Sequence, residues 1–133
     1  MDVRALIFGG GALIFSAASL PAFAHHSYAE FDTDKKMTLE GTVKEFQWTN
    51  PHSWLLVIVP NASGQEEQWA VELNSVSLLA ERGWKPKTVK PGDKVAITFH
   101  PMRNGSHAGS YMAIKLPDGK TMGDADRLGT AAQ

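Results

Sequence analysis

The histidines are the side chains of this sequence that are best suited to chemistry. The chain has 5 of them and no cysteine, so imidazole is its main transition-metal ligand, and thiolate catalysis or a Cys-ligated metal is excluded. The histidines fall into two groups. His25 and His26 are adjacent, whereas His52, His100 and His107 lie far apart in the sequence. A site that uses the second group requires a fold that brings distant segments together.

An export signal precedes the first group. Arg4 and the free amine form a short basic region, Ala5–Leu20 is an uncharged apolar run, and Ala22–Ala24 fits the small-x-small rule for signal peptidase. The apolar run is shorter than the ~20 residues that span a bilayer. We therefore expect residues 1–24 to be a cleaved signal peptide, with no transmembrane anchor left, and a soluble periplasmic protein that begins at His25.

Cleavage before His25 would create a metal chelate at the new terminus. The α-amine and imidazole of a terminal histidine can bind one ion together, and a tetragonal set of nitrogen ligands favours Cu(II). Cleavage one residue earlier would place His26 third, where the amine, two backbone amides and the imidazole form another square-planar chelate for Cu(II) or Ni(II). Histidines also follow signal peptides without any metal role, and no compact motif such as His-Glu-x-x-His occurs.

Hydrophobic periodicity predicts the elements that would position the other histidines. Alternating or continuous apolar residues predict strands over 37–48, 53–59, 68–73, 95–100 and 111–116, with a short possible sixth. The alternation in the first strand changes parity, which indicates a β-bulge near Lys44-Glu45. After the third strand the period becomes helical, and we expect a helix at about Ser75–Arg82, with Asn74 as N-cap and Gly83 at its C-terminal end.

This order of elements predicts an all-β fold: a small OB-like, five-stranded Greek-key barrel over residues 37–122, with one short helix between strands 3 and 4. Another small antiparallel sandwich or barrel is the alternative. We interpret residues 25–36 as an extended N-terminal arm and 123–133 as a flexible C-terminal tail. In an OB barrel the loops after strands 1 and 4 flank the usual binding face, so His52, His100 and His107 are expected on one rim.

A second interpretation of this rim needs no metal. Trp48 and Trp54 bracket the turn that contains Asn50 and His52, and these four side chains could bind a glycan or peptide. Tryptophans at alternating strand positions more often belong to the core, and His52 could simply hydrogen-bond the loop backbone. The sequence leaves these alternatives open.

Two further classes of function are disfavoured. The net charge of −1 argues against nucleic-acid binding, because neutralisation of phosphates supplies most of the affinity. No nucleophile-elbow pattern surrounds Ser27, Ser53 or Ser106. We therefore expect a binding protein rather than an enzyme.

Several short segments of the mature sequence match a known pattern. The most specific are His25-His26-Ser27 and Trp48-Thr49-Asn50-Pro51-His52; the others are Phe31-Asp32, Gly41-Thr42-Val43, Trp69 with Glu72, Gly83-Trp84, Pro91-Gly92-Asp93 and His100-Pro101. Together they resemble a family of small exported bacterial proteins of unknown function. The resemblance implies a periplasmic protein with a small β-barrel and supplies no activity. The leading prediction is thus a non-enzymatic periplasmic protein that binds a transition metal, with Cu(II) as the favoured ion. Its predicted ligands are His25, His26, His52, His100 and His107. A small extracytoplasmic ligand at Trp48, Asn50, His52 and Trp54 is the alternative.

Overall fold

The computed structural model describes residues 28–124. The expected signal peptide, His25, His26 and most of the expected C-terminal tail lie outside the described residues. The described elements are η1 (Tyr28–Glu30), β1 (Met37–Gln47), β2 (Trp54–Pro60), β3 (Glu66–Glu72), α1 (Val76–Glu81), β4 (Lys94–Pro101), β5 (Ala108–Lys115) and β6 (Thr121–Gly123). No helix in this part of the chain is long and apolar enough to cross a bilayer.

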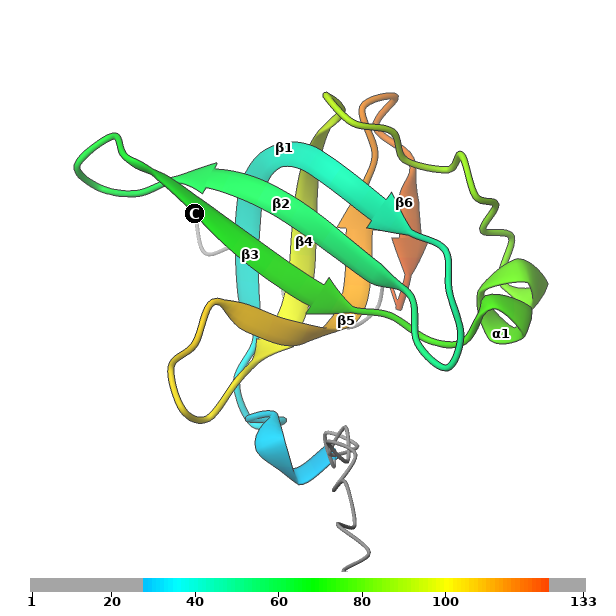
Figure 1. The fold of residues 1–133 in the computed structure, drawn as a ribbon, viewed down its shortest axis with the longest axis horizontal. Coiled ribbons are helices and arrows are strands. Elements are labelled where there is room, and N and C mark those ends of the chain that lie inside the picture. The colour runs from blue at the N-terminus through cyan, green and yellow to red at the C-terminus, as the bar shows by residue number, and fades with distance from the viewer. Residues whose placement is uncertain (1–27, 125–133) are drawn as a thin grey trace, which may run out of the picture.

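The strands close into a barrel (Figure 1). The sheet has the order β3-β2-β1-β4-β5-β6, and β3 also pairs with β5 in parallel, which joins the two sides of the sheet. The barrel therefore runs β1-β2-β3-β5-β4 and returns to β1, while β6 extends from β5. This is the strand order of an OB barrel, and the predicted all-β, OB-like fold is confirmed.

The predicted β-bulge in the first strand is also present. The pairing of β1 with β2 shifts register between Val43 and Glu45. Because the extra residue reverses the alternation, Phe46 and Trp48 pack against the core on the same side as Val43. The rings of Phe46 and Trp48 meet edge to face, with centroids 5.8 Å apart.

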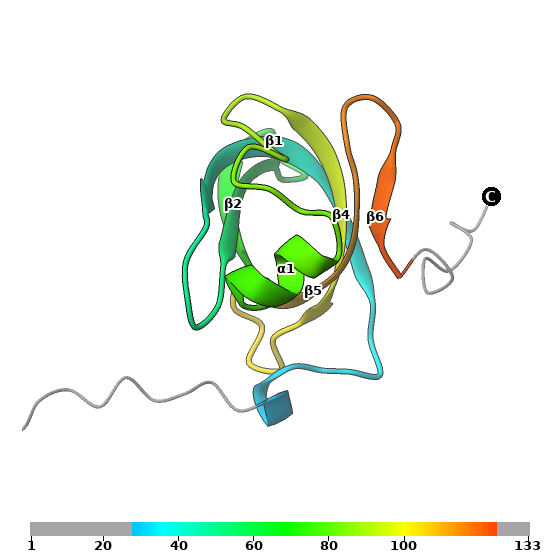
Figure 2. The same cartoon turned by 90° about the vertical axis from the view of Figure 1, so that its right-hand side faces the viewer.

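The helix α1 begins and ends one residue inside the expected range. Its N-cap is Ser75, whose hydroxyl accepts a hydrogen bond from the Leu78 amide at 3.5 Å; the prediction of Asn74 was therefore wrong by one position. Gly83 follows the helix with a φ of 85°, a left-handed conformation that glycine adopts without strain. Figure 2 shows α1 lying across one opening of the barrel.

The core fills the inside of the barrel and the space under α1. Its most buried members are apolar and come from every barrel strand and from the segment after β3: Val43, Leu55, Val57, Val71, Leu79, Trp84, Val89, Ile97, Phe99 and Ile114. Since the interior is filled, a ligand site has to lie on the outer surface.

The prediction of an N-terminal arm that is extended throughout was wrong for its described part. It begins with η1, and Phe31 then forms an isolated antiparallel bridge with Met102 in the β4–β5 loop. The Arg103 amide donates to the Glu30 carbonyl at 2.9 Å. Phe31 is 5% exposed, so burial of this side chain explains why the arm folds back onto the barrel.

Candidate functional site

A row of four side chains crosses the outside of the barrel. Trp54 pairs with Glu72, Glu72 with Ser110 and Ser110 with His100, on the adjacent strands β2, β3, β5 and β4. Their neighbours Leu55, Val71 and Phe99 belong to the core, so alternation directs the row outward. Neighbouring strands are spaced by about 4.8 Å, which places the Glu72 and His100 backbones about 10 Å apart.

At one end of this row, Glu72 pairs with a histidine of the β1–β2 loop. The Nδ1 atom of His52 contacts Oε1 of Glu72, whose side chain is only 9% exposed. The second carboxylate oxygen, Oε2, is buried and has no hydrogen-bond partner among the described residues. A buried polar atom without a partner costs about 1–3 kcal/mol and calls for an explanation. A bound cation or hydrogen-bond donor would provide one.

His100 lies at the other end of the row and is 8% exposed. Its Nδ1 lies 2.7 Å from the Lys35 carbonyl oxygen. A carbonyl oxygen only accepts, so Nδ1 carries the proton and Nε2 has a lone pair in the neutral ring. His52 is held through Nδ1 on an oxygen in the same way. Histidines that bind metals are commonly oriented by this kind of contact, with Nε2 left for the ion.

Two hollows of about 420 and 440 Å³ lie over the row. They share four lining residues: Tyr28, Arg82, Tyr111 and Asp124. The larger is also lined by His52 and Glu72, and the smaller by His100 and Met112. We call the two hollows together the cleft. The structure therefore places His52 in the larger hollow of the cleft and His100 in the smaller one.

The histidines and acidic side chains of the described residues do not complete a metal site by themselves. Within residues 28–124, no group of three or more His, Cys, Asp or Glu side chains is placed so that it could hold a metal ion. His25 and His26, the other predicted ligands, lie outside the described residues. Their part in a site stays a prediction.

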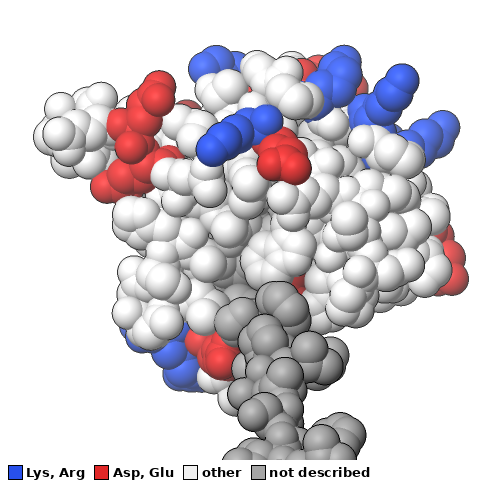
Figure 3. All heavy atoms as spheres, in the orientation of Figure 1, with Lys and Arg blue, Asp and Glu red and all other residues white. Residues whose placement is uncertain are grey.

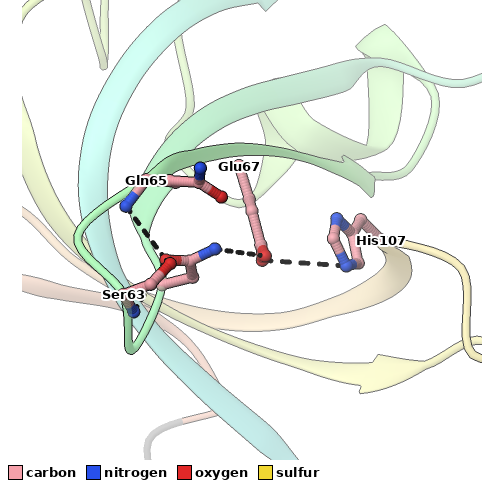
Figure 4. Close-up of polar contacts among 5 residues, drawn as sticks. Ser63, Gln65, Glu67 and His107 are labelled. Carbon is pink, nitrogen blue, oxygen red and sulfur yellow. Dashed lines mark hydrogen bonds and ion pairs between the residues drawn. The ribbon is translucent and has the colours of Figure 1, made fainter.

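His107 lies elsewhere, although it belongs to the β4–β5 loop as expected. Its ring stacks on Trp69 with centroids 4.5 Å apart. Its Nε2 is 3.7 Å from Oε2 of Glu67, and Glu67 in turn accepts a hydrogen bond from Asn61 at 3.0 Å. Figure 4 shows His107 at the end of this chain of contacts from the β2–β3 turn. His107 does not line the cleft, because stacking on Trp69 directs its ring away.

The four residues that were predicted to bind a glycan or peptide without metal do not form one site either. Trp48 is partly buried against the core. The Asn50 side-chain oxygen accepts a hydrogen bond from the Val76 amide at 3.0 Å and so helps to cap α1. Trp54 stands in the outward row beside Glu72. Of these residues only His52 lines the cleft. Figure 3 shows that the face over β2 and β3 carries few charges, of both signs.

Sequence reasoning missed several cleft residues. Glu72 entered only through a resemblance, because its position near His52 follows from the register of β2 with β3. Tyr111 was assigned only to a strand. Its hydroxyl donates to the Met122 carbonyl at 2.9 Å, and burial raises its pKa.

The family model described as "Family of unknown function (DUF6152)" matches residues 13–112. The chain belongs to this family. The predicted resemblance to a family of unknown function is thereby confirmed, while the His-His-Ser terminus and the Trp-Thr-Asn-Pro-His turn stay unconfirmed as its features. No match is found among curated proteins.

Among solved structures, the mitochondrial single-stranded DNA-binding protein Rim1 of S. cerevisiae is similar to this DUF6152 chain. The sequences are 14% identical, the match covers 62% of this chain and 93% of that chain, and the TM-score is 0.45. At this level the likeness carries no argument about function. The fold assignment rests on the strand order and on the parallel closure between β3 and β5.

Proposed function

We propose that this DUF6152 protein is an exported, periplasmic binding protein, not an enzyme. Its ligand is a transition metal ion, with Cu(II) as the favoured ion. The observation that carries the proposal is the common orientation of His52 and His100. Each uses Nδ1 on an oxygen acceptor, and each lines one of the two hollows of the cleft. Each therefore has Nε2 left as a nitrogen donor.

The mature N-terminus supplies the remaining donors in this proposal. Tyr28 lines both hollows, and an extended chain spans about 3.5 Å per residue. His25 can thus reach about 10 Å from Tyr28, and His26 about 7 Å. The amine and imidazole of His25, joined by His52 and His100, form an all-nitrogen set, with His26 as a substitute donor. His107, which the sequence suggested as a second substitute, stacks on Trp69 outside the cleft.

The chemistry of this donor set favours Cu(II). The chain has no thiolate, and Cu(II) heads the affinity order of divalent ions on nitrogen ligands. The Glu72 carboxylate would act through His52, because it holds the imidazole in a fixed orientation. Metal binding competes with protons for imidazole, so affinity should fall on acidification.

Titration with Cu(II) on protein with the authentic His25 terminus tests the proposal, by calorimetry and electron paramagnetic resonance. An extra residue before His25 should weaken binding, and H52A with H100A should weaken it at least 10-fold, the lower range for loss of an orienting or ligating group. His107→Ala is the matched control, because that histidine lies outside the cleft. It should bind Cu(II) like the unmodified protein.

Two results would overturn the proposal. One is Cu(II) affinity no greater than that of a free His-His-Ser peptide. The other is an equal loss in the His107→Ala control and in the double variant. If only the N-terminal extension abolishes binding, the terminus chelates alone and the cleft takes no part.

A metal-independent ligand is the second candidate, and the position of Trp54 favours it. Trp54 pairs with Glu72 on the outward row, so a glycan or peptide that donates hydrogen bonds to Glu72 could stack on the indole. Titration with such ligands should then quench tryptophan fluorescence without metal, and Trp54→Ala should remove the response. A response that survives in Trp54→Ala would exclude this role.

A further inference from the structure

Met112 is buried in an unusual place. It is 7% exposed but does not belong to the hydrophobic cluster that fills the barrel. In the pairing of β4 with β5, Phe99 pairs with Tyr111 and Thr98 with Ala113, so Met112 is the extra residue of an irregularity. Irregularities of this kind commonly redirect a side chain near a functional site.

The smaller hollow of the cleft contains both Met112 and His100 in its lining. The two residues lie on adjacent strands, since His100 pairs with Ser110, two residues before Met112. Their side chains offer two different donors, a thioether sulfur and the Nε2 of an imidazole whose Nδ1 is already engaged. No other described histidine lines this hollow.

We propose that His100 and Met112 form a site for a soft monovalent ion, Cu(I), in the smaller hollow. Thioether sulfur is a soft donor that selects Cu(I) over Cu(II) and over hard cations. The chain has no cysteine, so methionine is its only sulfur donor. In the smaller hollow, Met112 offers such an ion a buried soft sulfur, and His100 offers an oriented imidazole nitrogen. The inference rests on the proposed function only in sharing His100, because Met112 has no part in the Cu(II) set.

The test measures Cu(I) and Cu(II) affinities on the same variants of the mature protein. Cu(I) affinity is measured without oxygen in competition with bathocuproine disulfonate, and Cu(II) affinity by calorimetry. Met112→Leu keeps the volume of the side chain and removes the sulfur. It should weaken Cu(I) binding at least 10-fold and leave Cu(II) binding unchanged. Met102→Leu is the matched control, since Met102 lines a different hollow, and it should change neither affinity.

A second measurement follows the binding of the ion to the unmodified protein. Ag(I), a redox-inert substitute for Cu(I), is added to unmodified protein that carries ¹³C-labelled methionine methyl groups. The Met112 methyl resonance should shift with one equivalent, while the resonances of Met37 and Met102 stay in place. The Met112 signal is assigned with leucine variants of the other methionines.

The outcomes separate this inference from the proposed function. Three results would overturn the Cu(I) site. They are a Cu(I) affinity that is unchanged in Met112→Leu, an equal loss of affinity in Met102→Leu, and a Met112 methyl resonance that does not shift. A protein that binds Cu(I) through Met112 but binds Cu(II) no better than a free peptide would keep this inference and refute the Cu(II) proposal.

Discussion

Gly109 in β5 is the position where a single methyl group should do the most damage to the barrel beneath the cleft. A Cβ atom built there would lie 2.6 Å from the His100 carbonyl oxygen and against two atoms of the Phe99 ring, the farther at 2.8 Å. Ordinary van der Waals contact begins at 3.4 Å. Phe99 has no exposed surface, and its ring packs on Trp69 with centroids 5.6 Å apart. The ring therefore has no free space into which it could move.

These contacts set the expected cost of Gly109→Ala. Overpacking a filled core costs about 1–3 kcal/mol, and the backbone contact with His100 places this case at the upper end. The lower chain entropy of alanine in the unfolded state offsets about 0.4–1 kcal/mol. We expect a net loss of about 2 kcal/mol in the free energy of unfolding. At an m-value of about 1.5 kcal/mol/M, the urea midpoint should fall by a little more than ~1 M.

Urea unfolding followed by tryptophan fluorescence measures this loss, and two further variants test its cause. Gly64→Ala meets no atom within 4 Å and should cost only the left-handed backbone penalty, about 1 kcal/mol. Combining Gly109→Ala with Phe99→Leu should cost less than the two changes separately, because the smaller side chain leaves room for the methyl group. Strictly additive costs would show that the Phe99 ring is not what the methyl group meets, and the reasoning would be refuted.

Two other predictions concern groups at the ends of the barrel. Asn50→Ala removes the side-chain acceptor of the Val76 amide and should lower the free energy of unfolding by about 1 kcal/mol, as measured by thermal or urea unfolding. Asn50→Asp keeps the acceptor and should leave the free energy of unfolding unchanged. Burial raises the pKa of Tyr111, so the folded protein retains the phenol proton to higher pH than the unfolded chain, whose tyrosines titrate near ~10. Stability should therefore be full below about pH 10 and fall above it by up to ~1.4 kcal/mol per pH unit; Tyr111→Phe should lose this dependence, and an unchanged slope in that variant would assign it to another group.

Local patterns in the sequence were sufficient to predict most of the elements of the barrel. Alternation located the strands, the parity change located the bulge before Phe46, and Gly83 marked the end of α1. The start of β5 could not be found in this way, because Ala108 and Gly109 carry no hydrophobic signal. Their strand forms through parallel pairing with β3, a contact between segments far apart in the chain.

The candidate site was predicted less completely for the same physical reason. Loop order predicted that His52 and His100 lie on one rim, and in the structure they line two hollows that share four residues. The role of Glu72 depends on the register of β2 with β3, which composition and spacing do not specify. The direction of His107 depends on the availability of the Trp69 face for stacking, which is a property of the packed structure.

The burial of Glu72 constrains the ligand whatever its identity. A carboxylate that is 9% exposed has lost most of its water, and His52 provides a partner for only one of its two oxygens. A ligand that only accepts hydrogen bonds would leave Oε2 unpaired and add repulsion from the carboxylate, so anions are poor candidates for the larger hollow. An amine or a hydroxyl donor would pair Oε2 directly, whereas a metal ion on Nε2 of His52 would offset the charge of the carboxylate through the imidazole. Glu72→Gln separates these cases. The affinity for a cation should fall, because the negative charge is lost. The affinity for a hydroxyl-bearing ligand should be retained, because an amide oxygen can still accept its hydrogen bond.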